Sequence, residues 1–396
     1  MQAVILTAGK GTRFEPLSLT RPKPLFPVLG ESILEHDLRQ LKGLIDEAVI
    51  VYSSELVKEK IKEEFEGIKI KYVFQKEING TGSGVKLAYP FLQEKFVVLN
   101  SDDFYFKKDI EKVLKNFPCL LVKEHENPSN FGVILEQEGR VRELIEKPKN
   151  PVSNLVNTGL YFLPKSILEK DIEKSERGEY EFTDLIKSFI KENSLFAVRA
   201  EAWFPASYPW NIFDALEYLF QNRKTDIKAK REKNVAIKGK AIIGSGTIIK
   251  SGSYLEGPIY IGKNCLIGPN CYLRPFTVIN DNCKIGQAVE IKNSLIGENT
   301  NIRHLSYVGD SIIGSNCNLG AGTIVANLRH DQATIKTMVK GQLIDTQRKK
   351  FGAIIADNVK TGVATIVYPG RKIWPGRTTL PGERVSKDII SAEGGS

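Results

Sequence analysis

Several features that define other protein classes are scarce or missing in this chain of 396 residues. It has only five cysteines, an odd number, which argues against a disulfide framework and favours a reducing, cytoplasmic compartment. No run of 18 or more apolar residues occurs, so we expect no contact with a membrane. The densest basic cluster is residues 348–350, so nucleic acid is not expected as a partner. The apolar stretch at residues 3–6 predicts a buried strand rather than a signal peptide.

What is present is typical of a globular protein with more than one domain. Hydrophobic residues make up 41% of the chain and charged residues 26%, and the length suits two domains. The net charge of +9 is unevenly distributed. From residue 231 onward 22 basic residues face 12 acidic ones, whereas the first 230 residues carry 34 against 35. A cationic second half would serve phosphorylated ligands, nucleic acid, or no particular ligand.

The first part of the chain alternates short apolar strands with amphipathic helical stretches. This alternation predicts an α/β domain over residues 1–228, Rossmann-like, with a mostly parallel sheet and a ligand site at the carboxyl ends of its strands. The predicted strands are residues 3–6, 48–53, 69–75 and 96–100, and the predicted helices are residues 33–44, 58–65 and 82–89.

The second part follows a six-residue repeat. Nine hexads run without a break over residues 237–290, each beginning with an aliphatic residue and carrying a small residue fifth, and further hexads follow two five-residue steps. This period predicts a triangular solenoid in which the first position fills the interior and the fifth packs beside it. Four cysteines occupy the fifth position, which predicts small core residues rather than metal ligands (Cys265, Cys271, Cys283 and Cys317).

The repeat also predicts the domain boundaries. It resembles the hexapeptide repeat of acyltransferases built as a left-handed parallel β-helix, which implies such a domain over residues 235–390. Residues 221–234 are polar and charged and predict a linker, and residues 325–351 predict a projecting loop. Near the end, Arg371 and Arg377 fall at the fifth position. Either the register slips there, or these side chains face outward toward phosphates of coenzyme A.

A glycine-rich segment follows the first predicted strand, with the sequence LTAGKGTRFEPLSLTRPKPLFPVLG. Gly9 and Gly11 allow backbone N–H groups to approach a phosphate, and Arg13 and Lys23 add cations. The whole string resembles the signature of sugar-1-phosphate nucleotidylyltransferases. The resemblance implies that a sugar phosphate attacks the α-phosphorus of UTP or dTTP and releases pyrophosphate, with Arg13 and Lys23 as catalytic cations.

The same resemblance implies further site residues. Asp102, in the run NSD, would bind Mg²⁺, and Gln75 ahead of Gly80-Thr81-Gly82 would read a pyrimidine base. The family usually has glycine where this chain has Ser101. The implied nucleotide-binding and sugar-phosphate-binding residues are Leu6, Ala8, Gly9, Gly11, Gln75, Gly80, Thr81, Gly132, Glu146 and Asn157, with Lys147 beside Glu146.

One position departs from this pattern. Pro205 stands where the family has a second Asp or Asn ligand for the metal, and proline has no ligating side chain. Asp103 would either compensate or be a solvent-facing turn carboxylate. Adjacent strand residues point to opposite faces, which favours the second alternative.

A second constellation lies within the repeats. The runs YLRP, VEIK, HLSYVGD, CNLGAGT and ANLR resemble bacterial bifunctional glucosamine-1-phosphate acetyltransferase/N-acetylglucosamine-1-phosphate uridylyltransferase. The resemblance implies acetyl-CoA as co-substrate, His304 as the base that takes a proton from the substrate amine, and a homotrimer. Around His304 it implies Arg274 and Lys292 on the sugar phosphate, with Tyr307, Asn318, Ala321 and Asn327 lining the rest of the site.

The leading hypothesis is therefore a bifunctional enzyme that makes a nucleotide-linked N-acetylamino sugar, closest in length to the archaeal-type versions. Two alternatives stay open because of Pro205: an acetyltransferase with a degenerate nucleotidyl site, or a sugar-nucleotide-binding regulatory or assembly protein. A β-helical zinc carbonic anhydrase needs three histidine ligands, whereas the second part of the chain has only His304 and His330. The sequence leaves open which sugar epimer, glucosamine or galactosamine, is used.

Overall fold

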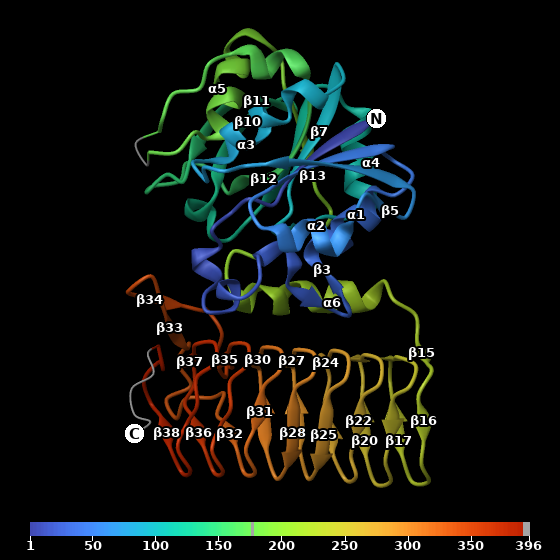
Figure 1. The fold of residues 1–396 in the computed structure, drawn as a ribbon. Helices are drawn as coiled ribbons and strands as arrows, with labels where there is room; N and C mark the ends of the chain where they lie inside the picture. Colours follow the sequence, from blue (N-terminus) through green and yellow to red (C-terminus); the bar gives the residue numbers. More distant parts are fainter. Residues whose placement is uncertain (176–177, 391–396) are drawn as a thin grey trace. The chain divides into compact units, whose positions relative to one another are not determined.

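The computed structural model describes residues 1–175 and 178–390, which form two compact units (Figure 1). The first unit consists of Met1–Lys10, Pro22–Leu25 and Ser32–Pro205. The second unit consists of Gly11–Arg21, Phe26–Glu31 and the chain from Ala206 onward. These units are defined by contacts. The functional division into residues 1–228 and 235–390 stays a prediction.

The first unit is built on one ten-stranded sheet, with the strand order β10-β11-β13-β9-β12-β7-β1-β4-β6-β5. Four strands predicted from the sequence form its parallel part, β7-β1-β4-β6, which confirms the Rossmann-like interpretation of residues 2–100. The strands of the sheet are β1 (Gln2–Leu6), β4 (Glu47–Tyr52), β5 (Glu64–Phe65), β6 (Ile68–Phe74), β7 (Lys95–Asn100), β9 (Cys119–Glu124), β10 (Gly132–Gln137), β11 (Arg140–Glu146), β12 (Leu155–Pro164) and β13 (Phe196–Arg199).

The prediction of a mostly parallel sheet needs correction beyond β7. There β12 runs antiparallel to both β7 and β9, and β10 and β11 form an antiparallel hairpin. In the β10–β11 hairpin the chain reverses at Glu138-Gly139, where both residues have positive φ (53° and 75°). Such a turn matches the twist of an antiparallel hairpin.

Helices cover both faces of this sheet. On one face, α1, α2 and α4 contribute to an apolar cluster with β1 and β4, and on the other face α3 and α5 contribute to a second cluster. Helix α1 begins sharply because Ser32 and Glu35 form a reciprocal capping box. The helices are α1 (Ile33–Leu41), α2 (Glu55–Ile61), α3 (Thr81–Leu87), α4 (Lys107–Lys115) and α5 (Phe182–Glu192).

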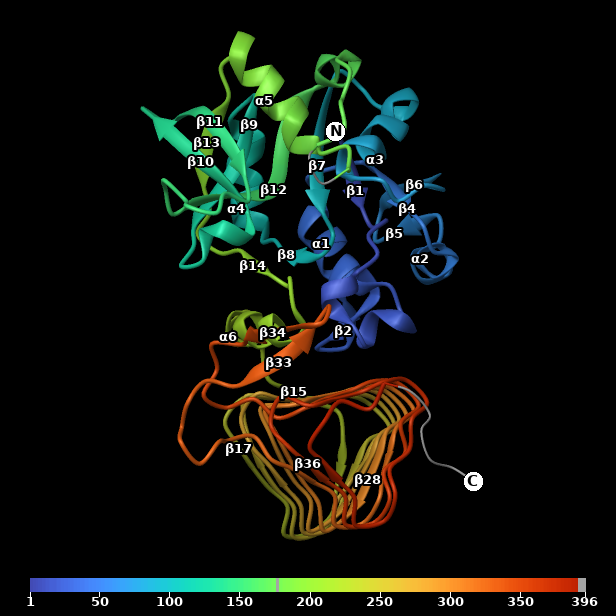
Figure 2. The ribbon, with the colours of Figure 1, turned by 90° about the vertical axis from the view of Figure 1, so that its left-hand side faces the viewer.

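The second unit contains helix α6 (Ile212–Gln221) and three parallel sheets, which we call the three-sheet region. Each strand pairs in parallel with a strand one coil further along, and the sheets enclose one interior (Figure 2). This arrangement is consistent with a β-helix.

The strands of the three-sheet region are short. Sheet A contains β15 (Asp226–Ile227), β18 (Ala241–Ile243), β21 (Ile259–Ile261), β24 (Thr277–Ile279), β27 (Leu295–Ile296), β30 (Ile312–Ile313), β35 (Ile354–Ile355) and β37 (Lys372–Ile373). Sheet B contains β16 (Lys230–Arg231), β19 (Ile248–Ile249), β22 (Leu266–Ile267), β25 (Lys284–Gln287), β28 (Asn301–His304) and β31 (Asn318–Leu319). Sheet C contains β17 (Ala236–Lys238), β20 (Tyr254–Glu256), β23 (Tyr272–Leu273), β26 (Glu290–Lys292), β29 (Tyr307–Gly309), β32 (Ile324–Val325), β36 (Ile366–Val367) and β38 (Arg384–Val385).

The hexad pattern predicts the interior of this region correctly. First-position residues such as Ile243, Ile249 and Ile267 are fully buried in one apolar cluster. The four fifth-position cysteines belong to the same cluster and are free thiols. Burial raises the pKa of Cys271 to about 11, so this thiol is protonated at neutral pH.

The structure corrects the predicted linker, the predicted loop and the predicted register at the end of the repeats. The predicted linker at residues 221–234 already contains β15 and β16, which pair in parallel with β18 and β19 of the next coil. The loop predicted at residues 325–351 contains an antiparallel hairpin, β33 (Lys336–Val339) and β34 (Gln342–Asp345). The register does not slip at the end: Val367, Ile373 and Val385 stay buried at multiples of six residues.

None of the helices in the described residues is both long and apolar enough to cross a membrane.

Candidate functional sites

The carboxyl ends of β1 and β7 bring the first candidate site residues together. Strand β1 lies between β7 and β4, so the direction of strand succession reverses here, which is where α/β sheets place their ligands. Leu6 is level with Asn100 in the ladder, and the Ser101 N–H donates to the Leu6 carbonyl at 3.1 Å. The turn that carries Asp102 is thereby fixed to the end of β1.

Lys23 and Asp102, far apart in the sequence, form an ion pair with 2.9 Å between Nζ and Oδ2. Lys23 lies in a short helical turn (η3, Lys23–Leu25) and is 7% exposed, whereas the Asp102 side chain is 48% exposed. The Asp102 carboxylate is therefore accessible from solvent, while its cationic partner is buried.

The glycine-rich segment divides between the two units. Ala8 and Gly9 belong to the first unit, and a Cβ added at Gly9 would meet nothing within 4 Å, so the backbone there is accessible. Gly11 and Arg13 belong to the second unit, where Gly11 precedes a helical turn (η1, Thr12–Phe14) with a φ of 61°. Gly11 is therefore required by its backbone conformation.

A buried carboxyl group beside the Asp102 turn escaped the sequence analysis. Asp37 on α1 is fully buried, and burial, with Asp103 and Asp102 nearby, raises its pKa well above the ordinary value. Its neighbour His36 contacts the Tyr105 carbonyl at 3.0 Å through Nε2. Only the run HD within an amphipathic helix could have indicated it, because a polar pair on the buried face of a helix is unusual.

Pro205 lies close to the position where the second ligand was expected. Strands β8 (Asp103–Phe104) and β14 (Phe204–Pro205) pair antiparallel, with Pro205 opposite Asp103. Asp103 itself is buried, so the interpretation as a solvent-facing turn carboxylate is wrong. The β8–β14 ladder turns Asp103 inward beside the Asp37 carboxyl group.

The residues present suit a magnesium ion that is held mainly by its substrate. Within the described residues no group of three or more histidine, cysteine or acidic side chains is arranged to hold a metal. Asp102 is half exposed and supplies one carboxylate. Mg²⁺ commonly takes one or two carboxylates together with water and substrate phosphates, so a single Asp102 is compatible with it.

Gln75 and the Gly80-Thr81-Gly82 turn form one structure. The buried Gln75 amide donates to Ser83 Oγ at 3.0 Å and to the Gly80 carbonyl at 3.2 Å. Gly80 has a φ of 129°, and a Cβ there would overlap backbone atoms of Tyr180. Thr81 Oγ1 accepts a hydrogen bond from the Phe182 N–H at 3.0 Å. These hydrogen bonds therefore hold the turn and the Gln75 amide in one arrangement.

The three candidate sugar-binding residues converge as well. Gly132 is directly opposite Glu146 in the β10–β11 ladder, and a Cβ on Gly132 would lie 3.1 Å from Glu146 Oε2 and 3.5 Å from Asn157 Cβ. Glu146 pairs with Lys147 at 3.0 Å. Asn157 on β12 donates to Tyr161 Oη at 2.6 Å. The absence of a side chain at Gly132 therefore lets the Glu146 and Asn157 side chains lie close to the β10 backbone.

In the three-sheet region, the second candidate site centres on Lys292. Its ammonium group lies 3.2 Å from Asp310 Oδ2, and Asp310 also accepts hydrogen bonds from Asn293 and Asn327. Arg274, one coil earlier on sheet C, pairs with Glu290 Oε1 at 2.9 Å. Asp310 was not predicted as a site residue, although it ends the run HLSYVGD that carries the resemblance.

Tyr307 lies beside this group. Burial and the charges of Asp310 and Glu290 raise the pKa of Tyr307, so its hydroxyl is protonated at neutral pH. A Cβ on Gly309 would lie 2.5 Å from Tyr307 Oη and 2.6 Å from Asn327 Nδ2, so only glycine fits between these two side chains. Tyr307, Asn327 and Lys292 are therefore brought together as the sequence predicts.

His304 lies at the end of β28, where the chain turns toward sheet C. Its carbonyl accepts hydrogen bonds from Ser306 Oγ at 2.7 Å and from the Gly322 N–H at 3.1 Å, so Ala321-Gly322 stacks directly on it. The imidazole is exposed and makes no hydrogen bond or ion pair within the described part of the chain. Asn318 is exposed on β31 of the same sheet. Among the described residues of one copy of the chain, neither His304 nor Asn318 contacts Lys292 or Asp310.

Comparisons with known proteins identify the family of the chain. The nucleotidyl transferase family matches residues 2–205, and the GMPPB C-terminal domain matches residues 255–390. Bifunctional protein GlmU from Methanocaldococcus jannaschii is 46% identical over 99% of this chain and 96% of its own length. The chain belongs to the GlmU-type family of bifunctional nucleotidyltransferase/acetyltransferases.

Two further proteins are similar to this chain. A bifunctional sugar-1-phosphate nucleotidylyltransferase/acetyltransferase from Sulfurisphaera tokodaii is 41% identical over 98% of both chains. A crystal structure of a putative glucose-1-phosphate thymidylyltransferase from Bacillus anthracis covers 57% of this chain and 97% of its own, with a TM-score of 0.51 and 24% identity. That likeness shows a shared fold over the matched part of this GlmU-type enzyme.

Proposed function

We propose that this GlmU-type enzyme acetylates glucosamine-1-phosphate or galactosamine-1-phosphate with acetyl-CoA and transfers a nucleotidyl group from UTP or dTTP to a sugar-1-phosphate. The observation that carries the proposal is the Lys23–Asp102 pair at the carboxyl edge of β1 and β7, where a triphosphate would meet a buried cation and a carboxylate. The Sulfurisphaera tokodaii relative, named for the same two activities, supports it.

In nucleotidyl transfer, a sugar phosphate oxygen attacks the α-phosphorus and pyrophosphate leaves. Lys23 and Arg13 would neutralise negative charge that builds up on the phosphates, so positioning and charge supply most of the rate. Asp102 would hold Mg²⁺, which contributes charge neutralisation at the phosphate oxygens when bound. Gln75 would pair with the pyrimidine edge, while Gly132, Glu146 and Asn157 would recognise the sugar hydroxyls.

In acetyl transfer, the sugar amine attacks the thioester carbonyl of acetyl-CoA, an amide bond forms, and the carbon–sulfur bond breaks to release the coenzyme A thiol. His304 would accept the proton that the amine loses, because its ring is exposed and makes no other contact within the described residues. Arg274 and Lys292 would bind the sugar phosphate. Tyr307, Asn318 and Asn327 would orient the reacting groups, and Ala321 would let the coenzyme A arm approach the backbone.

Further properties are proposed with these activities. We propose that the three-sheet region is a left-handed parallel β-helix, because the hexad register and the pairing of successive coils are those of that fold. We also propose functional halves over residues 1–228 and 235–390, a homotrimer that completes the acetyl-transfer site, and a reducing cytoplasmic location, which the five free thiols support.

The alternative in which only acetyl transfer persists rests on Pro205. Its place opposite Asp103 removes one potential ligand from the β8–β14 ladder. The two functions are separated by measuring pyrophosphate release with Mg²⁺, N-acetylglucosamine-1-phosphate and either UTP or dTTP. We expect release at ordinary enzyme rates, and a loss of at least about 10²-fold in Lys23→Ala, the usual scale for removing a charge-stabilising group. Absence of release from a wild-type protein that still acetylates glucosamine-1-phosphate would favour the alternative.

A further inference from the structure

The segment of residues 11–21, which carries Arg13, packs within the second unit rather than with the sheet of the first. Phe14 and Leu17 are buried, and Phe14 meets Phe26 edge to face with 5.3 Å between ring centroids. Leu17 and Phe26 share a crevice with Leu295 and Ile313 of sheet A, in which only about 10 Å³ stays open. A space of that size holds at most about one water molecule, so the segment packs closely against sheet A.

Polar contacts fix the end of the segment to the three-sheet region. The guanidinium of Arg21 lies 3.1 Å from Ser315 Oγ, 3.4 Å from a Glu298 carboxylate oxygen and 3.9 Å from Asp357 Oδ2. Thr20 Oγ1 donates to the same Asp357 oxygen at 2.7 Å. The second Asp357 oxygen accepts the Ser315 N–H at 2.7 Å. Asp357 therefore joins the segment to a turn between two coils.

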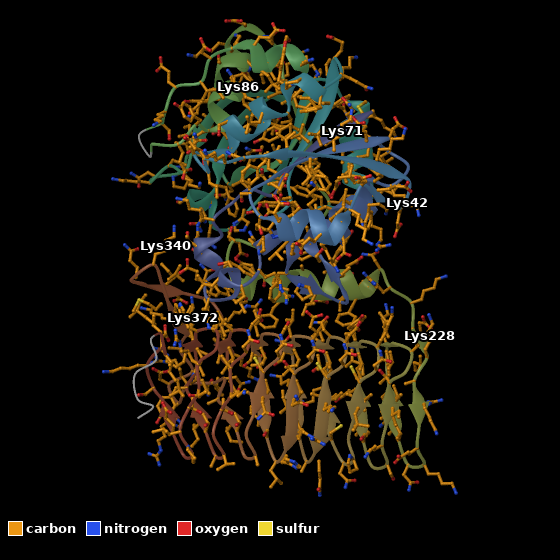
Figure 3. The ribbon with its side chains drawn as sticks, in the orientation of Figure 1. Lys42, Lys71, Lys86, Lys228, Lys340 and Lys372 are labelled. Carbon is orange, nitrogen blue, oxygen red and sulfur yellow. The ribbon has the colours of Figure 1, made fainter. Side chains whose placement is uncertain are left out.

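A second contact holds the middle of the segment. Lys372, on β37 and labelled in Figure 3, donates from Nζ to the Glu15 carbonyl at 2.9 Å. Its side chain is buried, and its backbone N–H donates to Asp388 Oδ1 at 2.9 Å. We call the contacts of Arg21, Thr20 and Lys372 the loop anchor.

Hydrogen bonds within the segment connect the loop anchor to Arg13. The Gly11 carbonyl accepts the Phe14 N–H at 2.8 Å and Ser18 Oγ at 2.8 Å. Arg13 therefore lies in a turn that is closed on both sides, with Ser18 only three residues before Arg21. If Arg21 were displaced, Arg13 would also move, because the segment between them is short and closely packed.

We propose that the three-sheet region positions the catalytic cation of nucleotidyl transfer, with Arg21 as the positioning residue that holds Arg13. Because Arg21 and its partners lie in the region that carries the acetyl-transfer residues, the first reaction depends on the structural integrity of the second region. This inference rests on the proposed function of Arg13. Arg21 itself touches no reacting atom.

The kinetic test compares Arg21→Ala with wild type in the full chain. We expect kcat for pyrophosphate release to fall about ten-fold or more, because small displacements of a catalytic group have effects on this scale. The KM for N-acetylglucosamine-1-phosphate and the rate of acetyl transfer should stay unchanged. Arg384→Ala, which removes an exposed arginine from β38, is the matched control. Asp357→Asn, which weakens the same contact from its other side, should reproduce the effect. Equal nucleotidyl transfer in Arg21→Ala, Arg384→Ala and wild type would overturn the proposal.

Hydrogen–deuterium exchange provides a readout that does not depend on activity. In Arg21→Ala the amides of residues 12–19 should exchange at least about ten-fold faster than in wild type, whereas sheet B should be unaffected. Unchanged exchange of residues 12–19 would overturn the proposal even if activity fell. Wild-type protein without pyrophosphate release would contradict the proposed function alone, because exchange still decides whether Arg21 holds the segment.

Discussion

The two candidate sites are built on opposite plans. In the first unit the polar side chains are buried among the ends of strands and helices: Lys23, Gln75 and Asn157 are all less than a tenth exposed. In the three-sheet region the interior is filled by repeating aliphatic residues and cysteines, and the candidate residues His304 and Asn318 lie on its outer surface.

Because of this difference, substituting a candidate site residue should affect stability in the first unit, whereas substituting an outward side chain of the three-sheet region should not. A buried polar group must have its partners, so a substitution in the first unit leaves an unsatisfied group and weakens the fold. The coils of the three-sheet region stack through their backbone ladders and interior residues, which do not depend on the outward side chains. Substitutions of the exposed residues His304 and Asn318 should therefore change activity alone.

The largest expected effect comes from His304→Ala. Removing a general base should lower acetyl transfer from acetyl-CoA to glucosamine-1-phosphate about 10²- to 10⁴-fold, measured as release of the coenzyme A thiol. The melting temperature and pyrophosphate release should stay at wild-type values, because the imidazole is exposed.

His330→Ala is the matched control, since His330 is the other exposed histidine of the second unit. It should keep full acetyl transfer. If both variants retained wild-type rates, His304 would not be the base, and a melting temperature lowered in His304→Ala alone would remove the contrast between the two sites.

A smaller effect, on stability, is expected from Gly80→Ala in the first unit. The added Cβ would overlap the backbone of Tyr180, and alanine disfavours a φ of 129°, so the free energy of unfolding should fall by about 2–4 kcal/mol. Gly139→Ala is the matched control, because Gly139 also has positive φ (75°) but nothing lies within 4 Å of its Cβ. It should cost about 1 kcal/mol. Equal losses of stability in urea titrations would show that the contact with Tyr180 is unimportant.

The sequence predicts the three-sheet region in detail because equivalent positions recur every six residues in the same environment. Each first-position aliphatic, such as Ile243 or Ile267, reports the same interior environment, and thirteen repeats reinforce one another. Two parts escaped this pattern: Asp226–Ile227 pairs with the first coil although its composition is that of a linker, and the β33–β34 hairpin interrupts the hexads.

The first unit is less predictable because its partners are far apart in the sequence. The parallel strands follow from local patterns, but the β12 pairing with β7 joins residues about 60 positions apart, and periodicity contains no signal for it. For the same reason Asp37 beside the Asp102 turn and Arg21 beside Asp357 were missed. In the sequence each is an ordinary charged residue, and only the fold brings its partner close to it.

Lys372 provides the finest test of the contrast, since it is a cation of the three-sheet region that is buried beneath the segment of residues 11–21. It is 2% exposed, and burial lowers its pKa from 10.5 to about 8, although Asp388 and Glu15 partly oppose the shift. Below pH 8 both the folded and the unfolded chain hold this proton. Between pH 8 and 10.5 only the unfolded chain does, so wild-type stability should rise with pH relative to Lys372→Gln, by about 2–3 kcal/mol in all. Urea titrations at pH 7, 8.5 and 10 measure this difference, with Lys360→Gln at an exposed position as the matched control. A difference in the free energy of unfolding between wild type and Lys372→Gln that did not depend on pH would show that the Lys372 ammonium is solvated. The outer surface of the three-sheet region would then tolerate a charge at this covered position as well.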